Sequence, residues 1–295
     1  MRAEPDRELV VFTQEEELAA GIAEVEVLFV RRPPHGYWSR ARRLRLIQTI
    51  GAGVDSVLPT PDLPERVLIA NARGVAAPHM SEFAIALLLA LAKRVPRAIE
   101  QQREHRWRLF LPRRLEGATL GILGLGAIGE AVAQKARGLG MRVLGTRRSG
   151  EPSPHADRVY PPSGTDEVLA ASDAVVVLLP LTPETRGLLD GARLARMKPG
   201  ALLVDLARGG IVDEAALASA LKEERLGGAA LDVFEVEPLP SESPLWDVPN
   251  LLITPHMAGI VDDYLDRVLA IFTENIGRLE RGEPLRNAVD RTRGY

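Results

Sequence analysis

The sequence contains no cysteine among its 295 residues. This absence excludes disulfides, thiolate nucleophiles, iron–sulfur clusters and zinc sites with cysteine ligands. It also suits a reducing compartment, so we expect a cytoplasmic protein, and we expect no bound metal.

The sequence also has no marked excess of charge of one sign, since its 37 Lys and Arg and 40 Asp and Glu give a net charge of −3. Without a basic excess we expect no nucleic acid and no anionic membrane as a partner. The longest apolar run, Phe83–Ala92, has about half of the ~20 residues that a bilayer-spanning helix needs. It follows Ser81 and Glu82, which are typical of a helix start, so we expect a buried helix there.

What the sequence does contain is a series of short apolar runs separated by helical stretches. Continuous apolar strands that alternate with helices indicate a parallel sheet covered on both faces. We therefore predict the α/β class with doubly wound parallel sheets. The expected strands are Leu9–Phe12, Val25–Val30, Leu44–Ile50, Val67–Ala70, Thr119–Leu123, Met141–Gly145, Ala174–Leu179, Ala201–Leu206, Gly228–Val233 and Leu251–Thr254.

A glycine motif, Gly124-Leu125-Gly126-Ala127-Ile128-Gly129, follows one expected strand and opens a helix that runs to about Leu139. Gly124 permits a tight turn, Gly126 lets the backbone approach a pyrophosphate, and Gly129 lets the helix lie close to the sheet. The helix N-terminus offers N–H groups and its positive dipole end to the phosphates. The motif therefore predicts a dinucleotide site; the alternative is a purely structural turn.

The position of this motif divides the chain. It normally ends the first strand of its domain, yet more than a hundred residues with four expected strands precede it. After Thr254 the strands end, and a long helical pattern, about Val261 to Arg281, follows. We expect a Rossmann nucleotide-binding domain at residues 92–263, inserted in a smaller flavodoxin-like substrate domain formed by residues 1–91 and 264–295.

The segment after the second strand of the expected nucleotide domain reads Thr146-Arg147-Arg148-Ser149. A site that prefers NAD usually has an acid here, which accepts hydrogen bonds from the ribose 2′-OH. Guanidinium groups at Arg147 and Arg148 suit a 2′-phosphate instead. We predict that NADP is preferred over NAD; the alternative is that both arginines are solvated surface charges.

Three ionisable residues follow three late strands, namely Arg208, Glu237 and His256. The carboxyl ends of parallel strands form the ligand site of such sheets. An arginine can hold a substrate carboxylate through two hydrogen bonds, and a histidine fixed by a carboxylate can move a proton. The set fits hydride transfer between a nicotinamide and a 2-keto or 2-hydroxy acid. Two questions stay open at this point: Arg208 could pair with Asp205 or Asp213, and Glu235 could take the role of Glu237.

Several longer blocks of sequence occur in a characteristic order: Gly121–Gly129, Leu179–Thr185, Leu206–Glu214, Leu231–Pro238 and Thr254–Gly259. In these blocks, and from about Leu44 to Asn287 as a whole, the sequence resembles the D-isomer-specific 2-hydroxyacid dehydrogenase family, with a glyoxylate/hydroxypyruvate reductase as the nearest type. The resemblance implies an NAD(P)-dependent oxidoreductase acting on the CH–OH group of donors, with Arg208, Glu237 and His256 as its catalytic residues.

The resemblance also implies ligand contacts and an assembly. Substrate would meet the backbone N–H groups of Ala52 and Gly53 as well as the Arg208 and His256 side chains. A homodimer would form through about Lys93–Gly117. Further cofactor contacts carry over to Ala127, Ile128, Pro180, Thr185, Ala207, Asp232 and Gly259.

The sequence departs from the family at Arg73, where proline is common, and in Ile260–Tyr264, where the family usually has a Thr-containing helix start. The identity of the substrate is therefore open. Formate dehydrogenases share the fold but have glutamine at the position of Glu237. The sequence is also compatible with a nucleotide-sensing co-repressor-like protein and with a phosphoglycerate dehydrogenase. Many phosphoglycerate dehydrogenases carry a C-terminal regulatory domain, which we do not expect after Tyr295.

Overall fold

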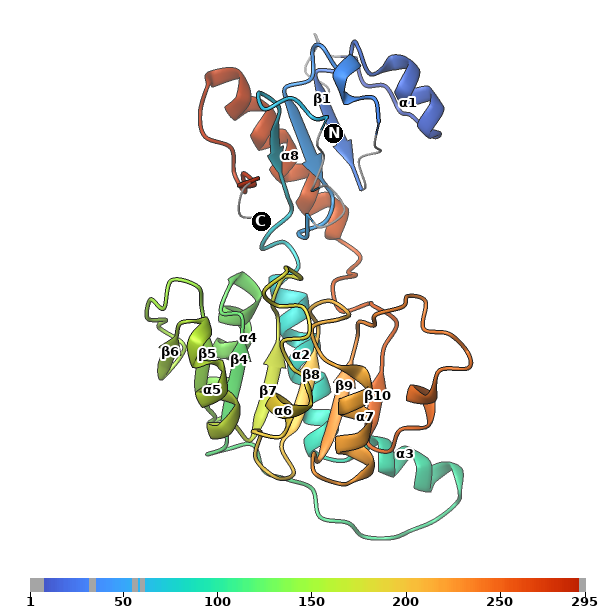
Figure 1. Cartoon of the computed structure of the whole chain (residues 1–295), viewed down its shortest axis with the longest axis vertical. Coiled ribbons are helices and arrows are strands. Elements are labelled where there is room, and N and C mark those ends of the chain that lie inside the picture. Colours follow the sequence, from blue (N-terminus) through green and yellow to red (C-terminus); the bar gives the residue numbers. More distant parts are fainter. Residues whose placement is uncertain (1–7, 32–35, 55–57, 59–61, 292–295) are drawn as a thin grey trace. The chain divides into compact units, whose positions relative to one another are not determined.

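Two sheets, each parallel throughout, organise the chain in the computed structural model, which describes residues 8–31, 36–54, 58 and 62–291 (Figure 1). One compact unit comprises Met1–Val75 and Val261–Tyr295, and the other is Ala76–Ile260. A Rossmann-like sheet with a separate smaller sheet confirms the predicted fold class.

The smaller unit is built on a three-stranded sheet in the order β1-β2-β3. Every residue of β2 is buried, as expected for the central strand of a covered parallel sheet. The ring of Phe29 lies 4.9 Å from that of Phe272 on the closing helix α8. The elements of this unit are α1 (Glu15–Gly21), β1 (Val27–Val30), the 3-10 helix η1 (Trp38–Arg40), β2 (Leu46–Thr49), β3 (Leu68–Ala70) and α8 (Tyr264–Arg281).

The expected strand Leu9–Phe12 does not form. Leu9, Val10 and Val11 are exposed, by 68%, 53% and 75%, and the described residues offer this segment no strand partner. A β-branched run becomes a strand only where its backbone groups pair and its side chains find a surface to pack on. Phe12 packs against the core of the unit without a strand around it.

The larger unit has a seven-stranded sheet in the order β10-β9-β8-β7-β4-β5-β6. The strand order reverses between β4 and β7, which is where ligands bind in doubly wound sheets. The sequence did not predict β6, a short and half-exposed edge strand. The strands are β4 (Thr119–Leu123), β5 (Arg142–Thr146), β6 (Arg158–Tyr160), β7 (Ala174–Val177), β8 (Leu202–Asp205), β9 (Gly228–Leu231) and β10 (Leu251–Ile253).

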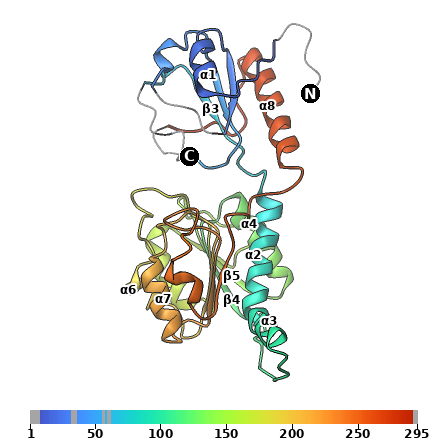
Figure 2. The same ribbon diagram turned by 90° about the vertical axis from the view of Figure 1, so that its right-hand side faces the viewer.

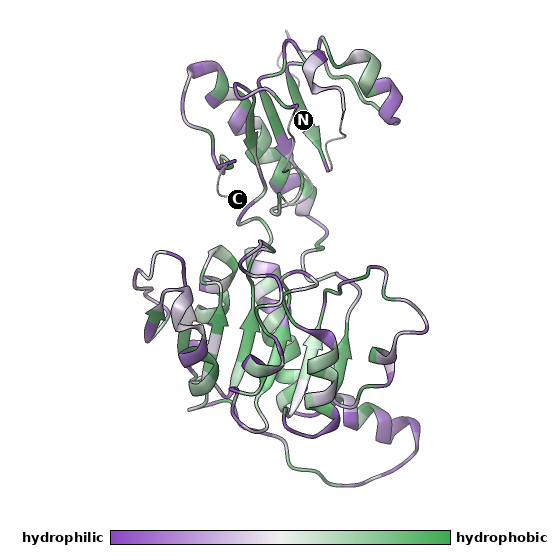
Figure 3. Ribbon diagram, in the orientation of Figure 1, coloured by the Kyte–Doolittle hydropathy of each residue, from purple (hydrophilic) through white to green (hydrophobic). Residues whose placement is uncertain are grey.

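Helices cover both faces of this sheet (Figure 2). Alternate residues of β7 divide between two cores: Val175 and Val177 pack toward α5, α6 and α7, whereas Val176 packs toward α2 and α4. Figure 3 shows the strands of this sheet as mainly hydrophobic and α3 as mainly hydrophilic. The remaining elements are α2 (Ala77–Ala92), α3 (Val95–Arg103), α4 (Ala127–Gly138), η2 (Pro162–Gly164), α5 (Thr165–Ala171), α6 (Gly191–Leu194), α7 (Glu214–Lys222) and η3 (Pro244–Asp247).

The sequence placed the first domain boundary after residue 91, but the structure divides the chain before α2. Leu88 and Leu91 of α2 are buried in the same core as Val132 of α4 and Leu202 of β8. The helix therefore belongs to the larger unit, because that sheet covers its apolar surface. Among the helices that the structure describes, none has the length and apolar content to cross a bilayer.

Candidate active site

The glycine loop joins β4 to α4 and has the shape that a pyrophosphate requires. Gly124 has a φ of +104°, and a Cβ there would lie 2.9 Å from the carbonyl oxygen of Leu178. A Cβ at Gly129 would lie 2.3 Å from the Gly124 carbonyl oxygen, so α4 packs directly on the loop. A Cβ at Gly126 would meet no atom within 4 Å. The loop is tight where it packs and open at Gly126, and therefore fits a dinucleotide.

The two arginines that follow β5 have different surroundings. Arg147 turns back onto the unit: its Nε donates to the Leu125 carbonyl at 2.9 Å, and its guanidinium pairs with Glu130 of α4. Arg148 is exposed. Its charge helps to lower the pKa of Glu184, after the larger effect of a hydrogen bond from the Thr182 side chain.

The loop after β7 contains Pro180 and Thr185, for which the family resemblance implies cofactor contacts. The Thr185 hydroxyl donates to the Pro180 carbonyl at 2.6 Å and accepts from the Thr182 backbone at 2.8 Å. These bonds fold the loop into a compact turn beside the strand-order reversal.

His256 and Glu237 form a pair. The Nδ1 atom of His256 lies 2.7 Å from Oε2 of Glu237, and the other oxygen of Glu237 accepts from the Phe234 backbone N–H at 3.0 Å. Glu237, and not Glu235, contacts the histidine; the catalytic role of Glu237 stays a prediction. His256 has a φ of +50°, a conformation that costs about 1 kcal/mol or more for a residue other than glycine. Such strain is typical of functional positions that the surrounding structure holds in place.

Asp232, which follows β9 directly, holds the loop that carries His256. One carboxylate oxygen accepts from the Thr254 hydroxyl at 2.5 Å and the Met257 N–H at 3.0 Å, and the other accepts from the Ala258 N–H at 2.9 Å. Asp232 is 1% exposed. Asp232 thus holds the Thr254 side chain before His256 and the backbone N–H groups of Met257 and Ala258 after it, a role that the sequence did not reveal.

Arg208 lies on the loop after β8, next in sheet order to the strands that precede Glu237 and His256. Its Nη1 donates to the Ala207 carbonyl at 2.8 Å. Gly209 is required beside it, since a Cβ there would lie 1.9 Å from the Phe234 carbonyl oxygen. This close approach joins the loop of Arg208 to the loop of Glu237.

Asp205, the last residue of β8, is a further buried acid at this edge. Its Oδ1 accepts from the Ala207 backbone N–H at 2.9 Å. Burial raises the pKa of Asp205 to about 7, with further increases from the charges of Glu214 and Asp232, whereas the hydrogen bond from Ala207 lowers it. The sequence suggests Asp205 only as a salt-bridge partner of Arg208; in the structure it shapes the backbone leading to that arginine.

In the smaller unit, Ala52 and Gly53 follow β2 in a loop held by side chains. The amide of Asn71 donates to the Ala52 carbonyl at 2.8 Å, and the Thr49 hydroxyl donates to the Gly51 carbonyl at 3.0 Å. The carbonyl groups of this turn are thereby tied down. The substrate contacts of Ala52 and Gly53 stay a prediction.

The structure thus brings Glu237 and His256 into contact and places the expected cofactor residues in the same unit. Ala127 and Ile128 begin α4, Ala207 precedes Arg208, and Gly259 follows Ala258 in the loop that Asp232 holds. The individual cofactor contacts stay predictions. The sequence did not identify the residues that support the site, such as Asp232, which anchors the loop of His256. The available signal was a polar residue at the end of an apolar strand.

These features fit a dinucleotide-binding domain of the Rossmann type. Residues 85–258 match the model of the D-isomer specific 2-hydroxyacid dehydrogenase NAD binding domain, and the chain belongs to this family. The resemblance inferred from sequence is confirmed.

Three relatives illustrate the similarity. D-3-phosphoglycerate dehydrogenase of Archaeoglobus fulgidus is 35% identical over 93% of this chain and 53% of its own length; the chain spans about half the length of the curated relatives it matches first. A D-isomer specific 2-hydroxyacid dehydrogenase from Xanthobacter autotrophicus Py2, solved with NADPH and MES, is 40% identical over 92% of this chain and 86% of its own, with a TM-score of 0.84. An NADPH-dependent glyoxylate/hydroxypyruvate reductase from Sinorhizobium meliloti, solved with NADP and sulfate, is 32% identical over 99% of this chain and 93% of its own, with a TM-score of 0.89.

Proposed function

We propose that the protein is an oxidoreductase that transfers a hydride between NADP(H) and a small 2-keto acid or D-2-hydroxy acid, as a glyoxylate/hydroxypyruvate reductase does. The observation that carries this proposal is the contact between His256 Nδ1 and Glu237 Oε2 at 2.7 Å, in the same unit as the glycine loop. Family membership and the similarity to a glyoxylate/hydroxypyruvate reductase support it.

The bound nicotinamide cofactor supplies the hydride. With Nδ1 engaged by Glu237, the Nε2 atom of His256 is the one that can give a proton to the keto oxygen as it is reduced. The Glu237 carboxylate contacts Nδ1 at 2.7 Å and so fixes the orientation of the ring. Arg208 binds the substrate carboxylate and polarises the keto group. The family resemblance supports a further contact of the substrate with the backbone N–H groups of Ala52 and Gly53.

We propose NADP(H) as the preferred cofactor because Arg147 and Arg148 stand where an NAD site has an acid. The NADPH and NADP complexes of two similar proteins support this preference. The larger unit is the nucleotide-binding domain of the proposed enzyme, and the smaller unit is its substrate domain.

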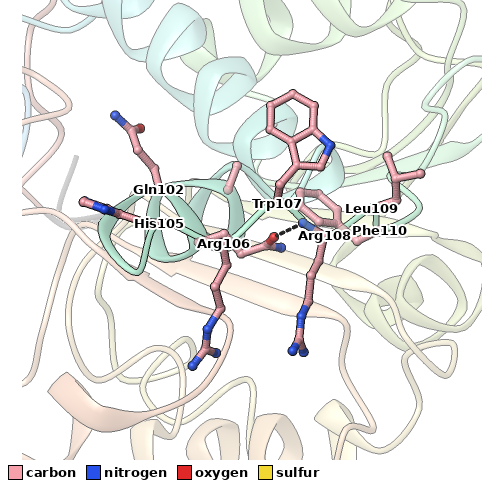
Figure 4. Close-up of a pocket in the computed structure, with 9 residues that line it drawn as sticks. Gln102, His105, Arg106, Trp107, Arg108, Leu109 and Phe110 are labelled. Atoms are coloured by element: carbon pink, nitrogen blue, oxygen red, sulfur yellow. Dashed lines mark hydrogen bonds between the residues drawn. The ribbon is translucent and has the colours of Figure 1, made fainter.

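We propose a homodimer formed through about Lys93–Gly117, in the cytoplasm. Trp107, Leu109 and Leu111 of this segment are 96%, 94% and 87% exposed, and α3 buries no residue. Figure 4 shows Trp107 and Leu109 on one side of the segment and Arg106 and Arg108 on the other. An apolar row of this kind is expected to be covered, and a second copy of the chain supplies a matching row.

The test is a panel of 2-keto acids with NADPH and NADH, followed by absorbance of the reduced cofactor. It comprises glyoxylate, hydroxypyruvate, pyruvate, phenylpyruvate and 3-phosphohydroxypyruvate. Turnover of glyoxylate or hydroxypyruvate with NADPH is expected. Efficient turnover of only the phosphorylated acid would identify a phosphoglycerate dehydrogenase, which the 35% identity to such enzymes makes the second candidate. Cofactor binding without turnover of any acid would favour a nucleotide-sensing protein.

A further inference from the structure

A carboxylate stands beside the arginine that is proposed to meet the 2′-phosphate. Glu130 lies in the first turn of α4, and its Oε1 pairs with the guanidinium of Arg147. Its Oε2 accepts a hydrogen bond from the Ser153 hydroxyl at 2.5 Å. Both side chains are about a quarter exposed, 24% for Arg147 and 26% for Glu130. The pair is thus screened by water only in part.

The remaining bonds of Arg147 hold it in this position. Its Nε donates to the Leu125 carbonyl at 2.9 Å, and its Nη1 donates to the Pro152 carbonyl at 3.3 Å. Ser153, which fixes Glu130, also accepts from the His155 backbone N–H at 3.1 Å. The result is a compact cluster between the glycine loop and the segment that follows β5.

This cluster lies where the adenosine ribose binds in doubly wound domains, at the exit of the second strand. A 2′-phosphate arriving there must share Arg147 with Glu130 and meets the negative charge of that carboxylate. A free 2′-hydroxyl carries no charge and is not repelled. Arg148 differs from Arg147 because it is exposed and its charge acts on Glu184.

We propose that Glu130 is a specificity-determining residue, whose carboxylate competes with the 2′-phosphate for Arg147 and so limits the preference for NADPH. This inference rests on the proposed NADP(H) site. The carboxylate of Glu130, and not the two arginines alone, then influences the ratio of NADPH to NADH affinity.

The experiment is a titration of the purified full chain with NADPH and with NADH at one ionic strength, using cofactor fluorescence to obtain dissociation constants. Glu130→Gln is expected to raise the ratio of NADPH to NADH affinity by about three- to thirty-fold, because a like charge is removed. Added salt should reduce this gain. The fragments 2′,5′-ADP and 5′-AMP should show the same difference, which isolates the phosphate from the nicotinamide.

The matched control is Glu82→Gln, which removes a carboxylate paired with another cation of α4, Lys135, at 3.7 Å. Its affinity ratio should change less than about twofold, since this pair does not involve Arg147 and is more exposed, by 67% for Glu82 and 36% for Lys135. Glu130→Ala is a second variant that removes the charge, in case the glutamine variant does not fold.

The inference is overturned if the ratio of NADPH to NADH affinity is unchanged in the Glu130 variants, or if the affinities for both cofactors rise equally. In either case the proposed function still stands as long as the protein binds NADPH. An equal rise of the ratio in Glu82→Gln also overturns the inference, since it would show a general effect of net charge. A wild-type chain that binds neither cofactor overturns the proposed function, and the inference with it.

Discussion

The carboxylate of Asp205 accepts a hydrogen bond from the backbone N–H of Ala207 at 2.9 Å, one residue before Arg208. The same carboxyl group is buried, with a pKa of about 7. The folded protein therefore binds this proton more tightly than the unfolded chain. The stability that this adds is complete below about pH 4 and is lost as the pH rises through 7.

Asp205→Asn keeps an acceptor for the Ala207 N–H and removes the titration. The free energy of unfolding of the variant minus that of the wild type should increase between about pH 4 and pH 7. The total increase should be up to about 4 kcal/mol, and the difference should be constant above that range. Urea unfolding at a series of pH values measures this difference. Parallel stability profiles for the two proteins would show that Asp205 is not protonated in the folded state.

Replacing the proton donor should slow the reaction without preventing cofactor binding. His256→Ala is expected to lower kcat by about 10²–10⁴, and Glu237→Gln by about 10² because the ring loses its charged partner. Glu235→Gln is the control, since Glu235 does not contact His256, and its kcat should stay within about twofold. The measurement is steady-state kinetics with the 2-keto acid of the panel that is turned over best. A near-normal kcat for His256→Ala would exclude this residue as the proton donor.

Arg208→Lys retains the positive charge but loses the planar guanidinium group, which can donate two parallel hydrogen bonds to a carboxylate. We expect kcat/KM for the keto acid to fall by about 10- to 10³-fold, since a bidentate donor becomes a point charge. The dissociation constant for NADPH, measured in parallel, should be unchanged. Loss of NADPH affinity with an intact KM for the acid would place Arg208 at the cofactor instead.

Gly209→Ala tests the close approach of two catalytic loops. The new methyl group would meet the Phe234 carbonyl oxygen at 1.9 Å, and we expect a loss of about 1–3 kcal/mol in unfolding free energy. Gly138→Ala in α4 is the control, because a Cβ there meets no atom within 4 Å and alanine favours a helix by up to about 1 kcal/mol. Equal melting temperatures for both variants would contradict the packing described.

The exposed apolar row after α3 makes the dimer testable by light scattering. Leu109→Glu is expected to shift the particle mass at micromolar concentration from twice the 32.1 kDa of the chain toward a monomer, because a charge would be buried in the interface. Leu265→Glu on α8, also an exposed leucine, should leave the mass unchanged. A wild-type monomer would defeat the dimer proposal.

The features that could be predicted from sequence were those set by neighbours along the chain. The strand, turn and helix around Gly124 form one continuous segment, so their residues carried the whole signal. The contact between Arg147 and Glu130 spans 17 residues and depends on how α4 lies beside β5, which no spacing rule reveals. The anchoring of the His256 loop by Asp232 likewise joins residues brought together only by the pairing of β9 and β10.

Two predictions differ from the structure, the first domain boundary and the strand Leu9–Phe12, and both differences have the same kind of physical cause. An evenly apolar helix such as α2 can be buried by any sheet, and its composition does not say which one. Leu9, Val10 and Val11 have the composition of a strand, but a strand also needs a partner. In both cases the deciding factor was a surface elsewhere in the chain.

The two units differ in how the chain forms them. Ala76–Ile260 is one uninterrupted stretch, whereas the other unit is made from both ends of the chain. Because the larger unit is a single segment, residues 76–260 can be produced alone as a candidate cofactor-binding fragment. The smaller unit cannot be produced as one segment, because Val268 and Ile271 of α8 pack in one apolar cluster with Ala72 and Val75, which lie nearly 200 residues earlier in the chain.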